Sequence, residues 1–264
     1  MVRSSQARYS VRPCRGIGEL EACIRLQKQI WGYADSELYP LRLFVNLTHI
    51  GGHVIGAFCS SGRGRAGELV GFVSGMPAWR DGKRYVHSLS LGVARGHENQ
   101  GLGRMLKAEQ REVSLQAGIA RIEWTFDPLR AKNAFFNIVR LGAITRRYQP
   151  DYYGHVESRL QQGLPSDRLV CEWWLNSARV RAALAPSAPS GGPPPALAAR
   201  GRGGERAIEI PLDLTTLAEQ EPDRARKLQR DVRRRFEGCF RRGLAVTGFE
   251  RGDGVGRYLL EPYS

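Results

Sequence analysis

The sequence has no long apolar run: no stretch of about eighteen consecutive apolar residues occurs, so a membrane-spanning helix is not expected. Its first residues, MVRSSQARYSVRPC, lack the apolar centre of a signal peptide, and we therefore expect no export. The 5 cysteines are scattered and form no C-x-x-C pair with metal-binding spacing. These absences predict a cytoplasmic protein with no metal and no membrane partner, whose cysteines are free or buried thiols.

Acidic residues are scarce relative to basic ones: 26 Asp and Glu stand against 40 Lys and Arg, for a formal net charge of +14. Such an excess favours anionic partners, namely nucleic acid, an acidic membrane surface or a polyanionic small molecule such as coenzyme A. Charge alone does not choose among them. The hydrophobic fraction of 42% over 264 residues is enough for a packed core in one large domain or two smaller ones.

Two common nucleotide-binding motifs are missing: the glycines follow neither the G-x-G-x-x-G order nor the P-loop pattern with its Lys-Ser/Thr. The chain does contain the stretch 84–103, RYVHSLSLGVARGHENQGLG, which predicts a strand, a glycine-rich turn and the start of a helix. Such a turn presents backbone N–H groups at a helix N-terminus, which suits a phosphate or pyrophosphate. Alternation along the strand predicts that four side chains share one face: His87, Leu89, Leu91 and Val93.

Three strands precede the glycine turn. Residues 53–60 and 68–79 are β-like and flank a glycine-rich loop, and Asp81-Gly82 is a tight-turn signal before the strand of the 84–103 stretch. A doubly wound nucleotide fold would instead alternate strands and helices from its start. The predicted class is α/β, with a mixed, mostly antiparallel central sheet flanked by helices.

The segment ENQGLG resembles the acetyl-CoA-binding motif of the GNAT N-acyltransferase superfamily, which usually reads Gln/Arg-x-x-Gly-x-Gly/Ala. Gly101 and Gly103 match this motif, whereas Glu98 stands where Gln or Arg is usual. The later segment WTFDPLRAKNAFFNIVRLGAI is similar to the family's next strand and the helix that follows it. The resemblance extends over residues 8–175 and implies a GNAT fold and an acyl-CoA-dependent transferase.

The resemblance implies acetyl-CoA, or another acyl-CoA such as succinyl-CoA, as the cosubstrate. Its pyrophosphate would bind the backbone N–H groups of the turn, its pantetheine would pair with the end of the strand, and the Glu98 side chain would turn outward. The expected cofactor-binding residues are Leu91, Val93, Glu98, Gln100, Gly101, Leu102, Gly103, Arg104, Asn133 and Asn137.

No cysteine or serine lies in a recognisable nucleophile elbow, so direct attack of an amine on the thioester is the simpler mechanism. Several GNAT enzymes have a glutamate base where this sequence has His87, and a histidine there would accept the proton of the amine. The family's usual acid, a tyrosine, is replaced by Ile138. Candidates for that acid are Tyr148, Tyr152 and Tyr153. Core or hairpin packing is the alternative for His87 and for each tyrosine.

In a GNAT fold, the two helices after the first strand shape the acceptor pocket. The expected acceptor-binding residues are Trp31, Tyr33, Arg42 and Asn46, and packing of the aromatic rings onto the sheet is an equally weighted alternative. Composition divides the chain into a transferase domain (1–178), a Pro/Ala/Gly-rich linker (179–206) and a small β–α–β–β segment (207–264) that we expect to dock on the main domain.

Three functions stay open. The favoured one is an N-acyltransferase that acts on a small primary amine. The second is a GNAT-fold protein that binds acyl-CoA without catalysis, suggested by Glu98 and Ile138. The third is a nucleic-acid-binding protein that uses a basic helix at 223–242, although no zinc spacing, RNP-like motif or helix-turn-helix supports it. The oligomeric state is open, a homodimer included.

Overall fold

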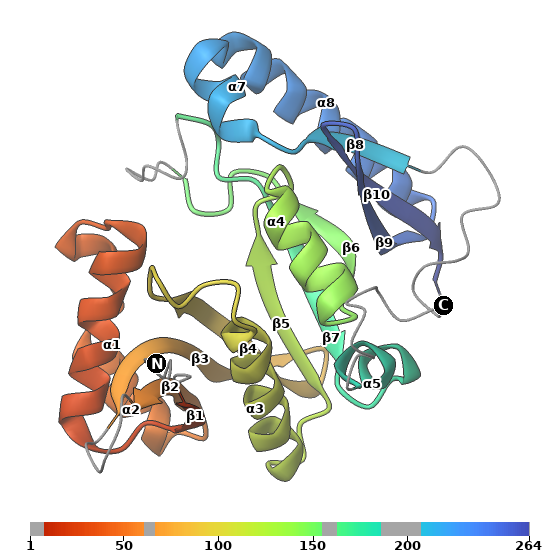
Figure 1. The fold of residues 1–264 in the computed structure, drawn as a ribbon. Coiled ribbons are helices and arrows are strands. Elements are labelled where there is room, and N and C mark those ends of the chain that lie inside the picture. The colour runs from red at the N-terminus through yellow and green to blue at the C-terminus, as the bar shows by residue number, and fades with distance from the viewer. Residues whose placement is uncertain (1–7, 61–66, 155–162, 186–206, 264) are drawn as a thin grey trace, which may run out of the picture. The chain divides into compact units, whose positions relative to one another are not determined.

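The computed structural model describes residues 8–60, 67–154, 163–185 and 207–263. Two compact units divide the chain, residues 1–122 and residues 123–264. Figure 1 shows helices and strands in each of these two units. The predicted mixed α/β class with a mostly antiparallel sheet is confirmed. The domain boundaries at 178 and 206 stay predictions.

The first unit has its strands in the order β1-β2-β3-β4, and each neighbouring pair is antiparallel. The β3–β4 hairpin closes through Asp81 and Gly82, whose φ angles of 52° and 71° suit a two-residue turn. The elements in chain order are β1 (Arg8–Pro13), α1 (Gly16–Trp31), η1 (Asp35–Glu37), α2 (Leu41–His49), β2 (His53–Ser60), β3 (Glu68–Arg80), β4 (Lys83–Val93) and α3 (Leu102–Gln116).

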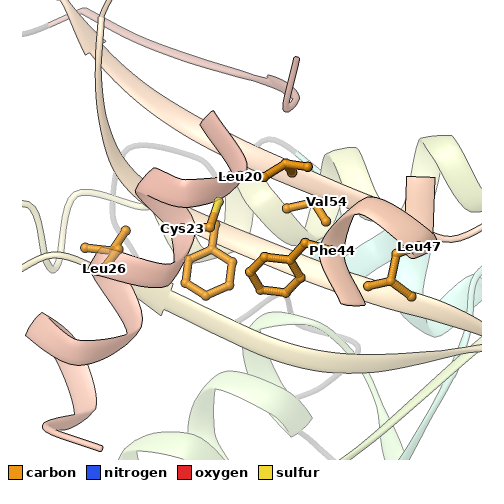
Figure 2. Packing of buried hydrophobic residues seen from close by; sticks show 7 residues of the cluster. Leu20, Cys23, Leu26, Phe44, Leu47 and Val54 are labelled. Carbon is orange, nitrogen blue, oxygen red and sulfur yellow. The ribbon is translucent and has the colours of Figure 1, made fainter. Parts of the chain in front are cut away.

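Helices α1 and α2 cover one face of these strands because their apolar residues recur at helical spacing. Figure 2 shows Leu20, Cys23 and Leu26 of α1 gathered with Phe44 and Leu47 of α2 in one buried cluster. Helix α3 covers the opposite face, and its buried residues join a second cluster from the alternate positions of the strands: Leu102, Leu106, Ile55, Ala57, Val70 and Val73.

A β-bulge interrupts the pairing of β3 with β4. Ser74 of β3 lies opposite Ser90, whereas the next residue of β3, Gly75, lies opposite Ser88. Leu89 is therefore the extra residue on β4. Bulges of this kind bend a strand locally and re-aim its side chains, and they are common next to active sites.

The bulge overturns the predicted face of β4. Leu89 packs with the α1–α2 cluster, whereas Leu91 and Val93 pack with the α3 cluster. One inserted residue reverses every side chain beyond it, so His87 and Leu89 do not share a face with Leu91 and Val93. The expectation of a common face was wrong for this reason.

The second unit has its strands in the order β5-β7-β6-β9-β10-β8. Strand β9 pairs antiparallel with β6 where Thr145 lies opposite Val246, so the C-terminal segment shares a sheet with β6. The elements are β5 (Arg121–Phe126), α4 (Ala131–Ala134), the π-helix η2 (Phe135–Arg140), β6 (Ile144–Gln149), β7 (Arg168–Trp174), α5 (Ala178–Leu184), β8 (Ala207–Pro211), α7 (Leu214–Gln220), α8 (Pro222–Arg241), β9 (Leu244–Gly252) and β10 (Val255–Pro262).

Helix α8 packs its apolar face against the rest of the second unit. The ring of Phe236 stacks on Tyr148 at 5.8 Å and meets the edge of Tyr258 at 5.1 Å. The buried Tyr258 hydroxyl donates to the carbonyl of Pro128 at 2.7 Å. The helix is therefore part of the core of this unit, and only its opposite side is exposed.

None of the five cysteines, all of which lie in the described ranges, forms a disulfide, and three of them, Cys23, Cys171 and Cys239, are buried. This agrees with the prediction that they are thiols. No helix in the described part of the chain is both long enough and apolar enough to cross a membrane.

Candidate functional site

The predicted pyrophosphate turn, residues 94–101, connects β4 to α3. Its backbone is left-handed at Gly96, Asn99 and Gly101, with φ angles of 87°, 60° and 80°. Glycine adopts this conformation without steric strain, and Asn does so more readily than most residues. Gly101, the first glycine of the resemblance to the GNAT motif, therefore occupies a position where the backbone favours glycine.

Helix α3 begins directly after Gly101. The Gly101 carbonyl accepts the N–H groups of Arg104 and Met105, both at 3.0 Å. A helix start leaves the preceding amides without an intrahelical acceptor, so the N–H groups of Gly101, Leu102 and Gly103 lie at the positive end of the helix dipole. The Arg104 amide, which we expected among the pyrophosphate donors, is used inside the helix.

The two polar side chains of the turn behave differently. Glu98 is exposed, so its carboxylate is accessible to water, as expected for an acid beside a phosphate site. The Gln100 side chain is engaged within the protein: its Oε1 accepts from the Tyr9 hydroxyl at 2.7 Å, and its Nε2 donates to the Gly96 carbonyl at 3.4 Å.

The end of β4 carries the backbone expected to pair with pantetheine. Leu91 and Val93 are half-buried, and their side chains pack toward α3. The Ala94 N–H donates to the Val70 carbonyl at 2.8 Å, which keeps β4 in register with β3 up to the start of the turn. The strand therefore delivers a fixed backbone to the glycine turn.

The predicted acceptor residues lie on α1 and α2 and in the loop between them. The Trp31 ring stacks on Tyr33 at 5.6 Å. A Cβ on Gly92 would lie 3.1 Å from the Trp31 ring, so the indole rests directly on the backbone of β4 and needs a glycine there. Arg42 and Asn46 are both exposed, one turn apart on α2.

His87, the predicted base, is half-buried on β4 opposite Met76. Alternation from Leu89 puts His87 on the face that α1 and α2 cover, and Trp31 packs against that same face. Strand β4 therefore carries His87 on the face that α1 and α2 cover and leads into the predicted pyrophosphate turn at its end.

A buried polar cluster lies against the bulged segment on its α3 side. Lys107 Nζ donates to Ser88 Oγ at 3.2 Å and to Gln110 Oε1 at 2.8 Å, and Gln110 Nε2 lies 2.9 Å from His53 Nε2. These four side chains are at most 6% exposed. Burial and then the charge of Lys107 lower the pKa of His53 to about 4, so His53 is neutral near pH 7. No sequence pattern connects these residues, and the sequence analysis missed them.

In the second unit, Asn133 and Asn137 differ in access. Asn133 is exposed, whereas Asn137 is 5% exposed and its Oδ1 accepts from the indole of Trp124 at 3.2 Å. Ile138, at the position of the family's usual tyrosine, is fully buried. The side chain of Asn137 thus fixes Trp124, and Asn133 is the more accessible of the two expected cofactor contacts.

Tyr148 does not fit the role of the proton donor. Its hydroxyl donates to Asp167 at 2.5 Å, and Asp167, which is fully buried, also pairs with the Arg233 guanidinium at 2.5 Å. Burial, followed by the bond to Asp167, raises the pKa of Tyr148 far above its ordinary value. A buried phenol committed to a carboxylate is a poor acid, so we assign Tyr148 to the core of the second unit.

Tyr153 is accessible, with 48% of its surface exposed. Its hydroxyl lies 3.2 Å from Thr125 Oγ1 at the end of β5, and the guanidinium of Arg168 lies 5.1 Å from the centre of its ring. Tyr152 meets the Tyr153 ring edge-on. In the described ranges, no group of three or more His, Cys, Asp or Glu side chains is arranged to hold a metal ion.

A bulged strand, a left-handed glycine turn and a helix N-terminus form an arrangement that suits a phosphate-bearing ligand. Residues 20–138 match the model of the acetyltransferase (GNAT) family, which assigns a GNAT acetyltransferase domain to this part of the chain. No curated protein matches the chain significantly.

Several solved structures are similar to this chain at low sequence identity. Arabidopsis thaliana NAA60 in complex with acetyl-CoA is 17% identical with a TM-score of 0.50, over 63% of this chain and 99% of that chain. The same protein in complex with a bisubstrate analogue is 18% identical with a TM-score of 0.50, over 64% of this chain and 100% of that chain. The ribosomal-protein-S18-alanine N-acetyltransferase of Escherichia coli is 13% identical with a TM-score of 0.48, over 65% of this chain and 96% of that chain.

Proposed function

We propose that the protein transfers the acetyl group of acetyl-CoA to a small primary amine by direct attack in a ternary complex. One observation carries this proposal: the bulge at Leu89 puts His87 on the face covered by α1 and α2, on the same strand that ends at the glycine turn. A base on the acceptor face and a phosphate-binding helix start are thus joined by one rigid element.

In this mechanism the pyrophosphate of acetyl-CoA binds the amides of Gly101, Leu102 and Gly103. His87 accepts a proton from the ammonium of the acceptor, directly or through water. The neutral amine nitrogen attacks the thioester carbonyl, so a C–N bond forms as the C–S bond breaks. The nitrogen gives up its second proton to water, and the thiolate of CoA leaves and takes up a proton. Tyr153, with 48% of its surface exposed, is kept from the sequence as the predicted donor of that proton.

The acceptor is assigned to the α1–α2 side of the first unit. Trp31 and Tyr33 form a stacked pair there, and Arg42 and Asn46 add exposed polar groups on α2. An exposed arginine favours an acceptor that bears a carboxylate. The accessible Glu98 side chain removes one reason for the alternative of a binder without catalysis, since it is free to point away from the phosphates.

The first experiment is calorimetric titration of the full chain with CoA and acetyl-CoA, followed by an acetylation assay against amino acids, polyamines, aminoglycosides and peptide N-termini. Binding of both CoA species and turnover of a small amine support the proposal. No binding at millimolar CoA overturns it. Turnover of peptide N-termini alone overturns the small-amine assignment and leaves the transferase in place.

The role of His87 is tested by His87→Ala. We expect kcat to fall by about two to four orders of magnitude with the Kd for CoA unchanged, because only proton transfer is lost. His49→Ala, at an exposed histidine near the end of α2, is the matched control and keeps the wild-type kcat. Equal kcat for His87→Ala and wild type would show that His87 is not the general base.

A further inference from the structure

Strand β1 contacts the predicted pyrophosphate turn, although the two are far apart in the sequence. The hydroxyl of Tyr9 lies 2.7 Å from Gln100 Oε1 and 3.0 Å from His97 Nδ1. The rings of Tyr9 and His97 meet edge-on, with centres 5.9 Å apart. Tyr9 also packs against the apolar cluster that buries Leu102, the first residue of α3. One side chain therefore touches both the turn and the apolar cluster to which the first residue of α3 belongs.

The hydrogen bonds around Tyr9 run in one direction. The carbonyl of Gly96 can only accept, so the Gln100 group that faces it must be the Nε2 donor. Gln100 Oε1 then faces Tyr9 and takes the single hydroxyl proton. The Tyr9 oxygen is left to accept from His97, which must carry a hydrogen on Nδ1. The chain of donors thus starts at His97, passes through Tyr9 and Gln100, and ends at Gly96.

These hydrogen bonds help to hold the conformation of the turn. Residues 94–101 include three left-handed positions, and one of them, Asn99, is not a glycine. A turn that must offer its amides to a ligand cannot use the same amides to hold its own shape. The backbone supplies one bond within the turn, from the His97 N–H to the Ala94 carbonyl at 3.1 Å, and the Tyr9 chain ties together positions 96, 97 and 100.

We propose that Tyr9 is a positioning residue for the acyl-CoA cosubstrate. Through Gln100 and His97 it holds the turn in the conformation that presents the amides of Gly101 to Gly103, so that CoA affinity depends on a hydroxyl group of β1. A preformed turn does not have to be ordered when the ligand binds, which improves affinity without any direct contact. The inference rests on the proposed binding of the pyrophosphate at this turn.

The test compares Tyr9→Phe with wild type by calorimetric titration with CoA. Loss of one hydroxyl that serves two hydrogen bonds should raise the Kd about three- to tenfold. The KM for acetyl-CoA should rise by the same factor, while kcat, the KM for the acceptor and the melting temperature stay at wild-type values. Tyr85→Phe is the matched control: its hydroxyl accepts from Arg80 at 3.1 Å in the same unit, near the start of β4, and its removal leaves the Kd unchanged.

Two further variants separate the hydrogen-bond chain from packing. His97→Asn keeps an N–H donor close to the place of Nδ1 and should retain affinity within about twofold, whereas His97→Leu should lose as much as Tyr9→Phe. Combining Tyr9→Phe with Gln100→Leu should weaken binding no more than Gln100→Leu alone, because both changes break the same chain.

The outcomes distinguish the two proposals. If wild type does not bind CoA, the proposed function fails and the inference fails with it. If wild type binds and Tyr9→Phe binds equally well, the inference is wrong and the function stands. A raised Kd accompanied by a lowered melting temperature and a lowered kcat would make Tyr9 a structural residue and overturn the positioning role.

Discussion

In the second unit, the buried carboxylate of Asp167 joins three segments through hydrogen bonds. It is fully buried, and it accepts from the Tyr148 hydroxyl, the Asp151 amide and the Arg233 guanidinium. A buried carboxylate is tolerated when hydrogen bonds and an opposite charge satisfy it, and losing one partner is costly for that reason.

Tyr148→Phe tests the structural assignment of this tyrosine. The change removes one hydrogen bond to a charged group, so we expect the free energy of unfolding to fall by about 1.5–3 kcal/mol. Both kcat and the KM for acetyl-CoA should stay at wild-type values. Urea unfolding and steady-state kinetics measure the two effects, and a large loss of kcat in a stably folded variant would return Tyr148 to the chemistry. Tyr153→Phe, which removes the accessible hydroxyl, is the comparison that should lower kcat.

His53 gives the protein a predictable pH dependence of stability. Its pKa is about 4 in the folded protein against an ordinary value of 6.5, so between these values the unfolded chain binds a proton that the native state does not. The contribution of His53 is therefore fully present above pH 6.5 and is lost as the pH falls toward 4. Its size is at most about 3 kcal/mol.

Urea unfolding of wild type and His53→Gln between pH 4 and pH 7 measures this contribution. Glutamine keeps a polar partner for Gln110 but does not titrate, so the variant should show a flatter loss of stability toward low pH. His49→Gln, at an exposed histidine, should retain the wild-type slope. Identical slopes for His53→Gln and wild type would contradict the lowered pKa.

At the scale of elements, the strand–turn–helix unit of residues 84–116 could be read from the sequence, because glycines and apolar periodicity record backbone conformation directly. The bulge at Leu89 could not. Residues 89–93 alternate without a break in the sequence, and the reversal of faces appears only when β3 fixes the register. The role of Tyr148 was mispredicted for a related reason. Its partner Asp167 directly precedes a different strand, β7, and no local sequence pattern links the two residues.

Gly92→Ala tests the packing of α1 on β4. The added Cβ would lie 2.7 Å from Ile30 Cδ1 and 3.1 Å from the Trp31 ring, so both side chains must shift. We expect a loss of about 1–3 kcal/mol of stability and a rise in the KM for the acceptor, with a smaller change in the Kd for CoA. Gly18→Ala is the control, since a Cβ there meets no atom within 4 Å in helix α1, and it should be neutral or stabilising. An unchanged KM for the acceptor in Gly92→Ala would show that Trp31 is not part of the acceptor site.

At the scale of the whole molecule, the formal net charge is +14, and part of the positive charge on α8 is paired locally. Arg224, Arg226 and Arg234 each pair with an acidic side chain three residues earlier in the chain. Arg233 is committed to Asp167, and Arg235 donates to the carbonyl of Ala207. Composition showed the excess of charge, but it could not show how much of that charge is neutralised locally.

We therefore expect weak binding to nucleic acid. Fluorescence anisotropy with a labelled duplex at 150 mM salt should give a Kd weaker than about 1 μM, and a steep decrease in affinity with salt. A triple Arg224→Glu, Arg230→Glu, Arg234→Glu variant should retain wild-type acetyl transfer. Tight, sequence-selective binding that this variant abolishes would revive the nucleic-acid function of α8.

The pairing of Asp167 with Arg233 also has a consequence for synthesis on the ribosome. While α8 is still inside the exit tunnel, the carboxylate of Asp167 has no arginine beside it, and strand β6 has no β9 to pair with. Strands β1 to β4 of the first unit have all left the exit tunnel once residue 122 has emerged from it. This unit can fold during translation, whereas the second unit must wait for its last strands and is the part that a chaperone would encounter unfinished.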